Sequence, residues 1–214
     1  MEQIFTEKDI LCAIKYAIRE LNKNDSLLLN IHCSERSQVH WLAIYFDKKI
    51  RENYRNNTSS PDIPEDYKVD VEYNRVGSIP DNTKQIRNLC DRCPWESELK
   101  KCKKKRTDNV TVDMVFHRRG INDVDSNFFC LEVKPSHNKA SKCDCQRIYN
   151  LVLNSKIGSK PIYQYGLALH LLEKDEQDGA NPLLADGTFY INNSDSSQGG
   201  DKPIAKGFKC YKFD

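Results

Sequence analysis

The sequence contains no apolar run long enough to cross a bilayer. Its longest uncharged stretch, residues 161–172, is well short of the roughly 20 residues that a membrane-spanning helix needs. It also lacks the apolar segment of a secretory signal, because Met1-Glu2-Gln3 leads into a charged amphipathic stretch. We therefore expect a cytoplasmic protein with no membrane partner.

An excess of charge of one sign is also missing. The 33 Lys and Arg residues nearly balance the 31 Asp and Glu residues, which leaves a net charge of +2. Overall charge therefore does not indicate a nucleic-acid partner, and only local clusters can do so. The length of 214 residues and the hydrophobic fraction of 38% are sufficient for a substantial core. We expect residues 1–214 to form a single domain.

Cysteine, in contrast, is abundant, with nine residues in the chain. Without a secretory signal, free thiols or a metal site are better interpretations than a disulfide framework. Cys90 and Cys93 have the spacing of a zinc knuckle, and Cys102 is a third candidate ligand. The fourth ligand stays open among His117, Cys143 and Cys145. Because no second pair has the two-residue spacing, reduced thiols are favoured over structural Zn²⁺.

Hydrophobic spacing predicts a chain of mixed helices and strands. Helices are expected at residues 7–22, 35–53 and 144–154, and strands at residues 67–76, 110–118, 127–134, 162–172, 187–191 and 206–213. Residues 77–108 form a predicted Cys- and Lys-rich insertion, and residues 173–214 a C-terminal extension to a core at about residues 27–172. This order predicts an α/β fold with a mixed central sheet flanked by helices.

Two neighbouring strands place opposite charges on one patch. If their turn is centred between Asn122 and Asp123, Asp113 lies directly opposite Glu132. Directly opposed side chains are about 4.5–5.5 Å apart at Cβ, where two like charges are destabilising unless something neutralises them. Because side chains alternate along a strand, Lys134 shares the face of Glu132.

Two carboxylates and an ammonium group on one patch fit metal-assisted phosphodiester hydrolysis. Hard carboxylate oxygens bind Mg²⁺ or Mn²⁺, and a neighbouring lysine can orient or deprotonate the attacking water. A solvated cross-strand cluster of charges is the alternative interpretation of Asp113, Glu132 and Lys134. The apolar setting of residues 128–131 favours the catalytic one.

These residues resemble the PD-(D/E)xK nuclease superfamily, which has the restriction-endonuclease-like fold. The resemblance, to a largely uncharacterised bacterial group, covers about residues 27–172 and lies in Ser34-Glu35-Arg36-Ser37, residues 71–75, residues 117–120, Glu132-Val133-Lys134, residues 144–148 and Tyr165-Gly166. It implies an α-β-β-β-α-β core. It further implies that Asp113 and Glu132 bind the metal, that Lys134 assists the attacking water, and that Glu35 completes the metal site. Val112 departs from the proline usual in this pattern, a change that removes no ligand.

Basic residues gather in two places. The run before the Asp113 strand contains six of them, and two more lie at the end of that strand, near the turn: Lys100, Lys101, Lys103, Lys104, Lys105 and Arg106, then Arg118 and Arg119. Both groups are candidates for contacts with nucleic-acid phosphates. A solvated surface is the alternative for each.

Several polar residues each allow two interpretations. Glu35 either ligates metal or only suits the first turn of its helix, where the helix dipole favours acidic side chains. Glu72 is either a further carboxylate of the site or an ion-pair partner of Arg75. Asp144 and Arg147 either point towards the site or face water.

The combined expectation is a metal-dependent nuclease, with DNA favoured over RNA as substrate by the resemblance. Two alternatives stay open: a catalytically inactive nucleic-acid-binding module, and a regulatory or interaction subunit of the same fold. The intact Asp113, Glu132 and Lys134 set argues against both. A homodimer is an open option for the assembly.

Overall fold

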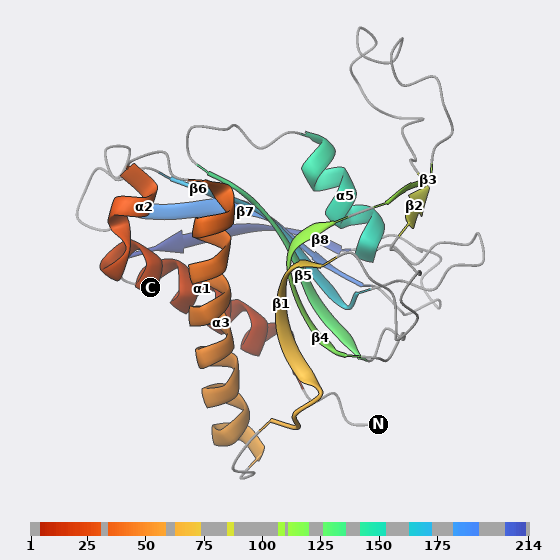
Figure 1. The fold of residues 1–214 in the computed structure, drawn as a ribbon, viewed down its shortest axis with the longest axis horizontal. Coiled ribbons are helices and arrows are strands. Elements are labelled where there is room, and N and C mark those ends of the chain that lie inside the picture. The colour runs from red at the N-terminus through yellow and green to blue at the C-terminus, as the bar shows by residue number, and fades with distance from the viewer. Residues whose placement is uncertain are drawn as a thin grey trace, which may run out of the picture.

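The computed structural model describes eleven stretches of the chain. They are residues 5–30, 34–58, 63–73, 85–87, 107–109, 111–119, 126–135, 142–152, 163–172, 182–192 and 204–212. Within them, a six-stranded sheet has helices on both faces (Figure 1).

Three helices precede the sheet: α1 (Glu7–Asn24), α2 (Ser26–Asn30) and α3 (Glu35–Thr58). Helix α1 begins with a capping box, in which Thr6 accepts from the amide of Asp9 and the Asp9 carboxylate accepts from the amide of Thr6. Its buried residues, from Ile10 to Leu21, recur at helical spacing. Helices α1 and α3 pack on each other and on the same face of the sheet.

The sheet has the order β1-β4-β5-β6-β7-β8. Its strands are β1 (Tyr67–Tyr73), β4 (Val112–Arg118), β5 (Asn127–Lys134), β6 (Tyr165–Leu171), β7 (Leu183–Ile191) and β8 (Ile204–Tyr211). Neighbours are antiparallel except β5 and β6, which are parallel and joined through α5 (Lys142–Val152). Strands β2 (Gln85–Arg87) and β3 (Thr107–Asn109) form a separate two-stranded sheet.

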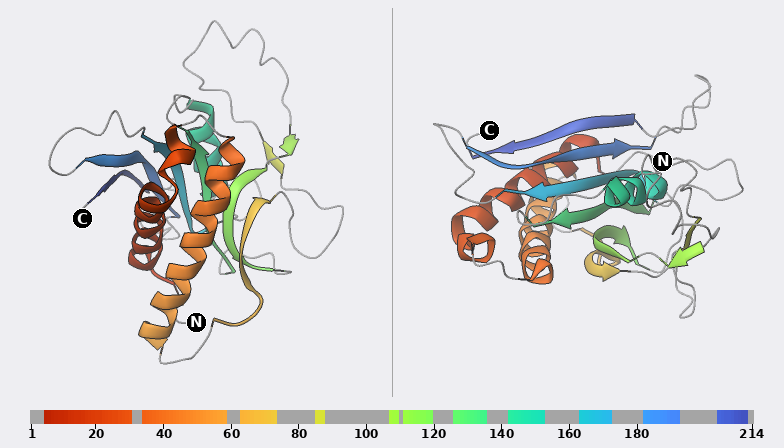
Figure 2. Two further views of the ribbon diagram at one scale, coloured as in Figure 1. Left: turned by 60° about the vertical axis from the view of Figure 1, so that its left-hand side comes forward. Right: turned by 90° about the horizontal axis from the view of Figure 1, so that it is seen from above.

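The sheet separates two hydrophobic clusters. The larger one joins α1 and α3 to side chains such as Phe116, Phe129 and Leu167. The smaller one joins Ile148 and Val152 of α5 to the opposite face. Figure 2 shows α5 separated by the sheet from α1 and α3. On the α5 face, α5 is the one described helix that packs on the sheet, and charged side chains of the strands lie beside it.

The predicted α/β class with a mixed sheet is confirmed. So is the hairpin register, because β4 and β5 pair as expected for a turn centred between Asn122 and Asp123: Met114 with Leu131, Val115 with Cys130, and Phe116 with Phe129. The register shifts between Phe116 and His117. The expected strand at 187–191 begins earlier, at Leu183, since residues 183–186 continue the pairing with β8.

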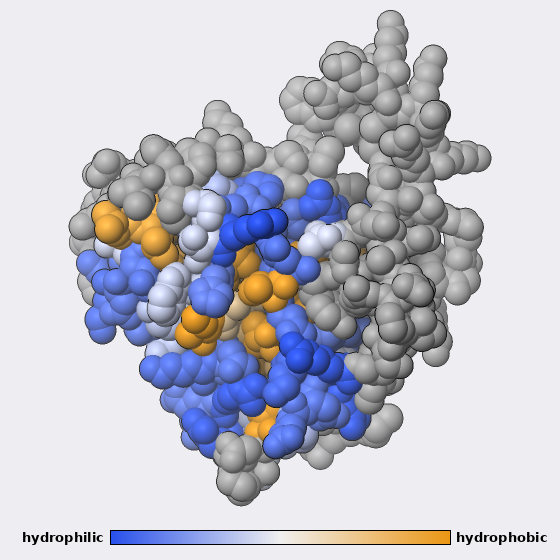
Figure 3. Space-filling view, viewed as in Figure 1, coloured by the Kyte–Doolittle hydropathy of each residue, from blue (hydrophilic) through white to orange (hydrophobic). Residues whose placement is uncertain are grey.

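The surface over α3 and β1 is mostly hydrophilic, and its small hydrophobic areas are interspersed with hydrophilic side chains (Figure 3). Ile44 of α3 and Val71 of β1 are among the exposed large apolar residues. No helix of the described part of the chain has the length and apolar character that spanning a bilayer requires. The homodimer stays a prediction.

Candidate functional site

A cavity of about 600 Å³ lies where α3, β1, β4, β5 and α5 meet. It is lined by eight residues: Glu35, Arg36, Glu72, Thr111, Asp113, Glu132, Lys134 and Arg147. All four residues predicted to carry the chemistry are among them. They come from three elements, because Glu35 opens α3, Asp113 lies near the start of β4, and Glu132 and Lys134 lie near the end of β5.

The backbone of the hairpin fixes the two strand carboxylates. Strand pairing through Met114 and Leu131 places Asp113 next to the end of β5. There its Oδ2 accepts a hydrogen bond from the amide of Val133 at 2.7 Å. Alternation along β5 turns Leu131 and Val133 towards α1 and α3, so Glu132 faces α5.

Burial disfavours the charged form of both carboxyl groups. It raises the pKa of Asp113 to about 6, with the nearby charge of Glu35 adding to the rise and the amide of Val133 opposing it. Burial and then the charge of Asp113 raise the pKa of Glu132 to about 7, against the opposing effect of Arg147. The two acids therefore interact electrostatically, and each has a pKa close to neutral pH.

Two cations stand beside these acids. The Lys134 ammonium lies 3.3 Å from Glu35 Oε2 and 3.7 Å from Glu132 Oε1. Arg147 of α5 pairs with the same Glu132 oxygen. The other oxygen, Glu132 Oε2, is buried and has no hydrogen-bond partner among the residues that the structure describes. An ionised oxygen in that position is costly and is a ready ligand for a cation.

Strand β1 contributes a strained residue to the rim. Glu72 has a φ of 50°, in the left-handed region that non-glycine residues rarely adopt. Its carboxylate pairs with Arg36 at 2.5 Å. Strain of this kind is retained where the surroundings hold it and is frequent at functional sites. The alternative partner, Arg75, lies outside the described residues.

The two arginines predicted to contact phosphates lie at the other end of the hairpin. Arg118 pairs with Asp66, and Arg119 with Asp70. The same Asp70 accepts from buried His117 at 2.8 Å. Burial would raise the pKa of Asp70, but the hydrogen bonds from Arg119 and His117 outweigh it and hold the pKa far below its usual range. These contacts connect β1 to β4. Arg118 and Arg119 are not among the residues that line the cavity.

The remaining predicted residues lie outside the described part of the chain. They are the basic run Lys100, Lys101, Lys103, Lys104, Lys105 and Arg106 and the candidate zinc ligands Cys90, Cys93 and Cys102. The cysteines whose side chains the structure describes, Cys12, Cys130, Cys145 and Cys210, form no disulfide with one another.

The sequence did not decide whether Arg147 points towards the site or faces water. Its position on the helix after the Glu132 strand was the only available signal, and that signal fits a solvent-facing residue equally well. The structure places Arg147 at Glu132 because α5 runs back across β5 and β6. Among the described residues, this ion pair links the helix directly to the candidate site.

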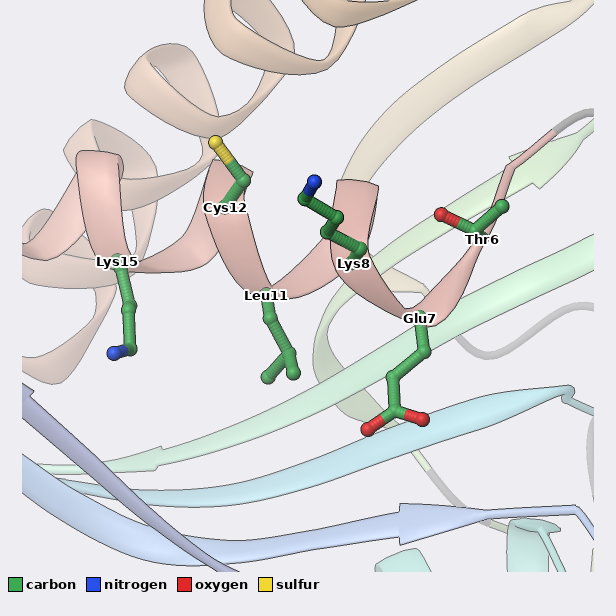
Figure 4. Close-up of a pocket in the computed structure, with 6 residues that line it drawn as sticks. All are labelled: Thr6, Glu7, Lys8, Leu11, Cys12 and Lys15. Carbon is green, nitrogen blue, oxygen red and sulfur yellow. The ribbon is translucent and has the colours of Figure 1, made fainter.

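A separate depression at the start of α1 has no comparable chemistry. Figure 4 shows Glu7, Leu11 and Lys15 directed towards the sheet, whereas Lys8 and Cys12 point the other way. Glu7 is paired with Lys206 of β8 at 2.8 Å. The polar groups that line this depression therefore do not converge on a common point.

The cavity of α3, β4 and β5 has a donor set that suits a hard divalent cation. Asp113 and Glu132 are both desolvated, and Glu132 Oε2 supplies an oxygen that no other described residue satisfies. As the side chains stand, no three His, Cys, Asp or Glu residues of the described stretches are grouped closely enough to hold a metal ion. Arg147 and Lys134 neutralise Glu132 in this arrangement.

Comparison of the chain with models of protein families, with curated proteins and with solved structures found no match.

Proposed function

We propose that this protein is a Mg²⁺- or Mn²⁺-dependent nuclease that hydrolyses phosphodiester bonds. The observation that carries the proposal is the pairing of two desolvated carboxyl groups, Asp113 and Glu132, in one cavity with the ammonium group of Lys134. Solvent-exposed surfaces rarely hold two neighbouring carboxyl groups with raised pKa values, whereas sites that bind cations and reacting groups often do.

The element order supports a restriction-endonuclease-like core. Leaving aside β2 and β3, which form a separate sheet, helix α3, strands β1, β4 and β5, helix α5 and strand β6 follow one another in the α-β-β-β-α-β order that the resemblance implies. We propose that α1 and strands β7 and β8 are additions to this core.

Five residues of the cavity have roles in the proposed reaction. Asp113 and Glu132 would hold the cation, with Glu35 completing the site from the first turn of α3. The bound cation would polarise the phosphate and make a water molecule more acidic. Lys134 would orient that water and offset the negative charge that develops on the phosphate, and Arg147, at the same edge, would add a second positive charge.

The resemblance favours DNA over RNA as the substrate. The test is to incubate plasmid, single-stranded DNA and RNA with the protein in the presence of Mg²⁺ or Mn²⁺, with EDTA as a control. We expect metal-dependent cleavage of DNA. Lys134→Ala is expected to lower the cleavage rate by on the order of 10²-fold or more, because it removes a charge that acts on the transition state.

Arg55→Ala is the matched control, since Arg55 lies in the last turn of α3 and is exposed. This variant is expected to cleave like the wild type. Cleavage that survives Lys134→Ala would remove the lysine from the mechanism. Failure of the wild type to cleave any of the three substrates with either metal would overturn the nuclease proposal.

A non-catalytic nucleic-acid-binding module is the second candidate. The ion pair between Arg147 and Glu132 favours it, because a guanidinium group occupies the carboxylate that a cation would need. Calorimetric titration with Mn²⁺ separates the two candidates. Binding that disappears in Glu132→Gln supports the nuclease, whereas nucleic-acid binding without any uptake of Mn²⁺ supports the module.

A further inference from the structure

A second cavity, of about 570 Å³, lies on the same sheet face as the candidate site, over β6, β7 and β8. Its lining includes Cys145, Ala168, His170, Asp186, Gly207 and Lys209. We name this cavity the β6–β8 groove.

Strand pairing joins the groove to the candidate site in two rows. Residues that pair across neighbouring strands direct their side chains to the same face. One row consists of Glu132, Ala168, Thr188 and Gly207, and the next of Lys134, His170, Asp186 and Lys209. Each row begins at a residue of the candidate site and ends on the edge strand β8. At the usual strand separation, each row spans about 14 Å.

The first row forms a low floor. Ala168, Thr188 and Gly207 have small side chains; Ala168 is buried against α5, whereas on β7 and β8 little stands above the sheet. A Cβ atom added at Gly207 would meet no other atom within 4 Å. The groove is therefore open at its outer end.

The second row supplies charge suited to an anion. It carries the ammonium groups of Lys134 and Lys209 at its two ends. Between them His170 is held by Asp186, whose Oδ1 lies 3.4 Å from His170 Nδ1. Asp186 is the single acid of this row and pairs with His170, and Lys134 contacts Glu35 and Glu132, so Lys209 supplies positive charge at the outer end of the row.

Helix α5 forms the wall of the groove and adds to its positive potential. Cys145 lines the groove, and Arg147, two residues further on, reaches Glu132 in the candidate site. Since α5 returns from the end of β5 to the start of β6, its first turn lies towards the ends of these two strands. The positive end of the helix dipole is thus on the side of Lys134 and His170.

We propose that the β6–β8 groove holds a single polynucleotide strand that leaves the scissile phosphate and runs to the edge of the sheet. A backbone phosphate would lie at Lys209, and the neighbouring part of the strand would lie against the ring of His170, which Asp186 orients. The length of the rows suits an oligonucleotide, because a lone phosphate would fill only one end. This inference rests on the proposed nuclease function, because it takes the candidate site as the place of reaction.

The test uses binding alone, measured by fluorescence anisotropy with a short labelled single-stranded DNA in EDTA. Gly207→Leu fills the open end of the groove and is expected to weaken binding by on the order of tenfold or more. Gly207→Ala, which adds only a methyl group in open space, is the matched control and is expected to bind within about twofold of the wild type.

Lys209→Ala provides a second measurement that a structural effect would not mimic. Loss of one phosphate contact to a single strand is expected to reduce the slope of log K against log salt concentration by about 0.7. Lys206→Ala, on the same strand but paired with Glu7 of α1, is expected to leave the slope unchanged.

Each outcome decides one question. Unaltered affinity in Gly207→Leu, an unaltered slope in Lys209→Ala, or absence of any binding by the wild type overturns the groove proposal. A duplex that binds more tightly than the single strand, and equally well to Gly207→Leu, overturns it too. Groove-dependent binding by a wild-type protein that cleaves nothing with Mg²⁺ or Mn²⁺ leaves the groove in place and refutes only the nuclease function.

Discussion

At the scale of single residues, stability and proposed function conflict most strongly at Glu132. Its exposed fraction is 3%, and its pKa is raised from an ordinary value of 4.5 to about 7. The folded state therefore holds the proton more tightly than the unfolded state does. Consequently, the contribution of Glu132 to the free energy of unfolding falls as the pH rises from about 4.5 to about 7, and it is constant above that range.

Glu132→Gln is expected to make the metal-free protein more stable at pH 8 while abolishing metal-dependent cleavage. Glutamine cannot ionise, so the variant escapes the cost of a buried charge beside Asp113. The expected gain in the free energy of unfolding is on the order of 1–3 kcal/mol at pH 8 and close to zero at pH 4. Urea unfolding in EDTA at the two pH values measures both quantities.

A variant less stable than the wild type at pH 8 would contradict this expectation. It would mean that the ion pair with Arg147 outweighs the desolvation of Glu132. Asp47→Asn is a suitable control, because Asp47 pairs with Arg51 within α3, away from the candidate site.

At the scale of secondary-structure elements, the packing of α5 on β6 determines the position of residues that line both cavities. The closest approach is at Gly166, where an added Cβ would lie 2.5 Å from Ile148 Cγ2 and 2.8 Å from Val152 Cγ2. Glycine at this position lets the helix pack directly on the strand. The same helix carries Arg147 to Glu132 and Cys145 to the β6–β8 groove.

Gly166→Ala is expected to displace α5 and to lower the free energy of unfolding by about 1–3 kcal/mol. The cleavage rate should fall with it, because Arg147 moves with the helix. Urea unfolding and the cleavage assay measure the two effects. In Gly207→Ala the added methyl group meets open space. If Gly166→Ala were equally stable, helix α5 could shift without a loss of free energy of unfolding.

The hairpin of β4 and β5 was the element most completely predictable from sequence. A turn centred between Asn122 and Asp123 was assumed from its polar residues and gives one register, which the pairing of Met114 with Leu131 confirms. That register alone determines that Asp113 and Glu132 lie near one another. Local pattern was sufficient here because the paired residues are close together in sequence.

Contacts between distant elements could not be predicted in this way. The pairing of Arg147 with Glu132 depends on the side-chain conformation of an arginine on a helix whose path was unknown. The link from Asp70 to His117 and Arg119 depends on β1 lying beside β4, and both strands offered several charged residues. Helix α2 was missed because five residues are too few for helical periodicity to emerge.

At the scale of the whole molecule, the last two strands belong to the same core as the first helix. Strands β7 and β8 contribute Leu184, Phe189 and Phe208 to the cluster that contains Ile14 and Leu21 of α1. Arg19 of α1 also donates to the carbonyl oxygen of Tyr211 at 3.0 Å. The predicted C-terminal extension is thus part of the sheet, because β7 pairs with β6 along seven residues.

A chain that ends at Leu172 is therefore expected not to fold into a monomer. Without β7 and β8 it would expose the unpaired edge of β6 and the apolar surface of α1. Size-exclusion chromatography is expected to give aggregates, and thermal unfolding followed by circular dichroism should lose its cooperative transition. A monodisperse truncated protein with a sharp transition would show instead that the preceding elements fold by themselves.

The contact of α1 with β8 also sets an order of events during translation. Of the described elements, α1 leaves the ribosome first and β8 last, yet Cys210 Sγ of β8 lies 3.7 Å from the Lys15 carbonyl oxygen of α1. The nascent helix can pack on α3 early, but the part of its surface that contacts β7 and β8 must wait for these strands to emerge before its native partner exists. In the living cell, this interval would make α1 a natural point of engagement for a chaperone.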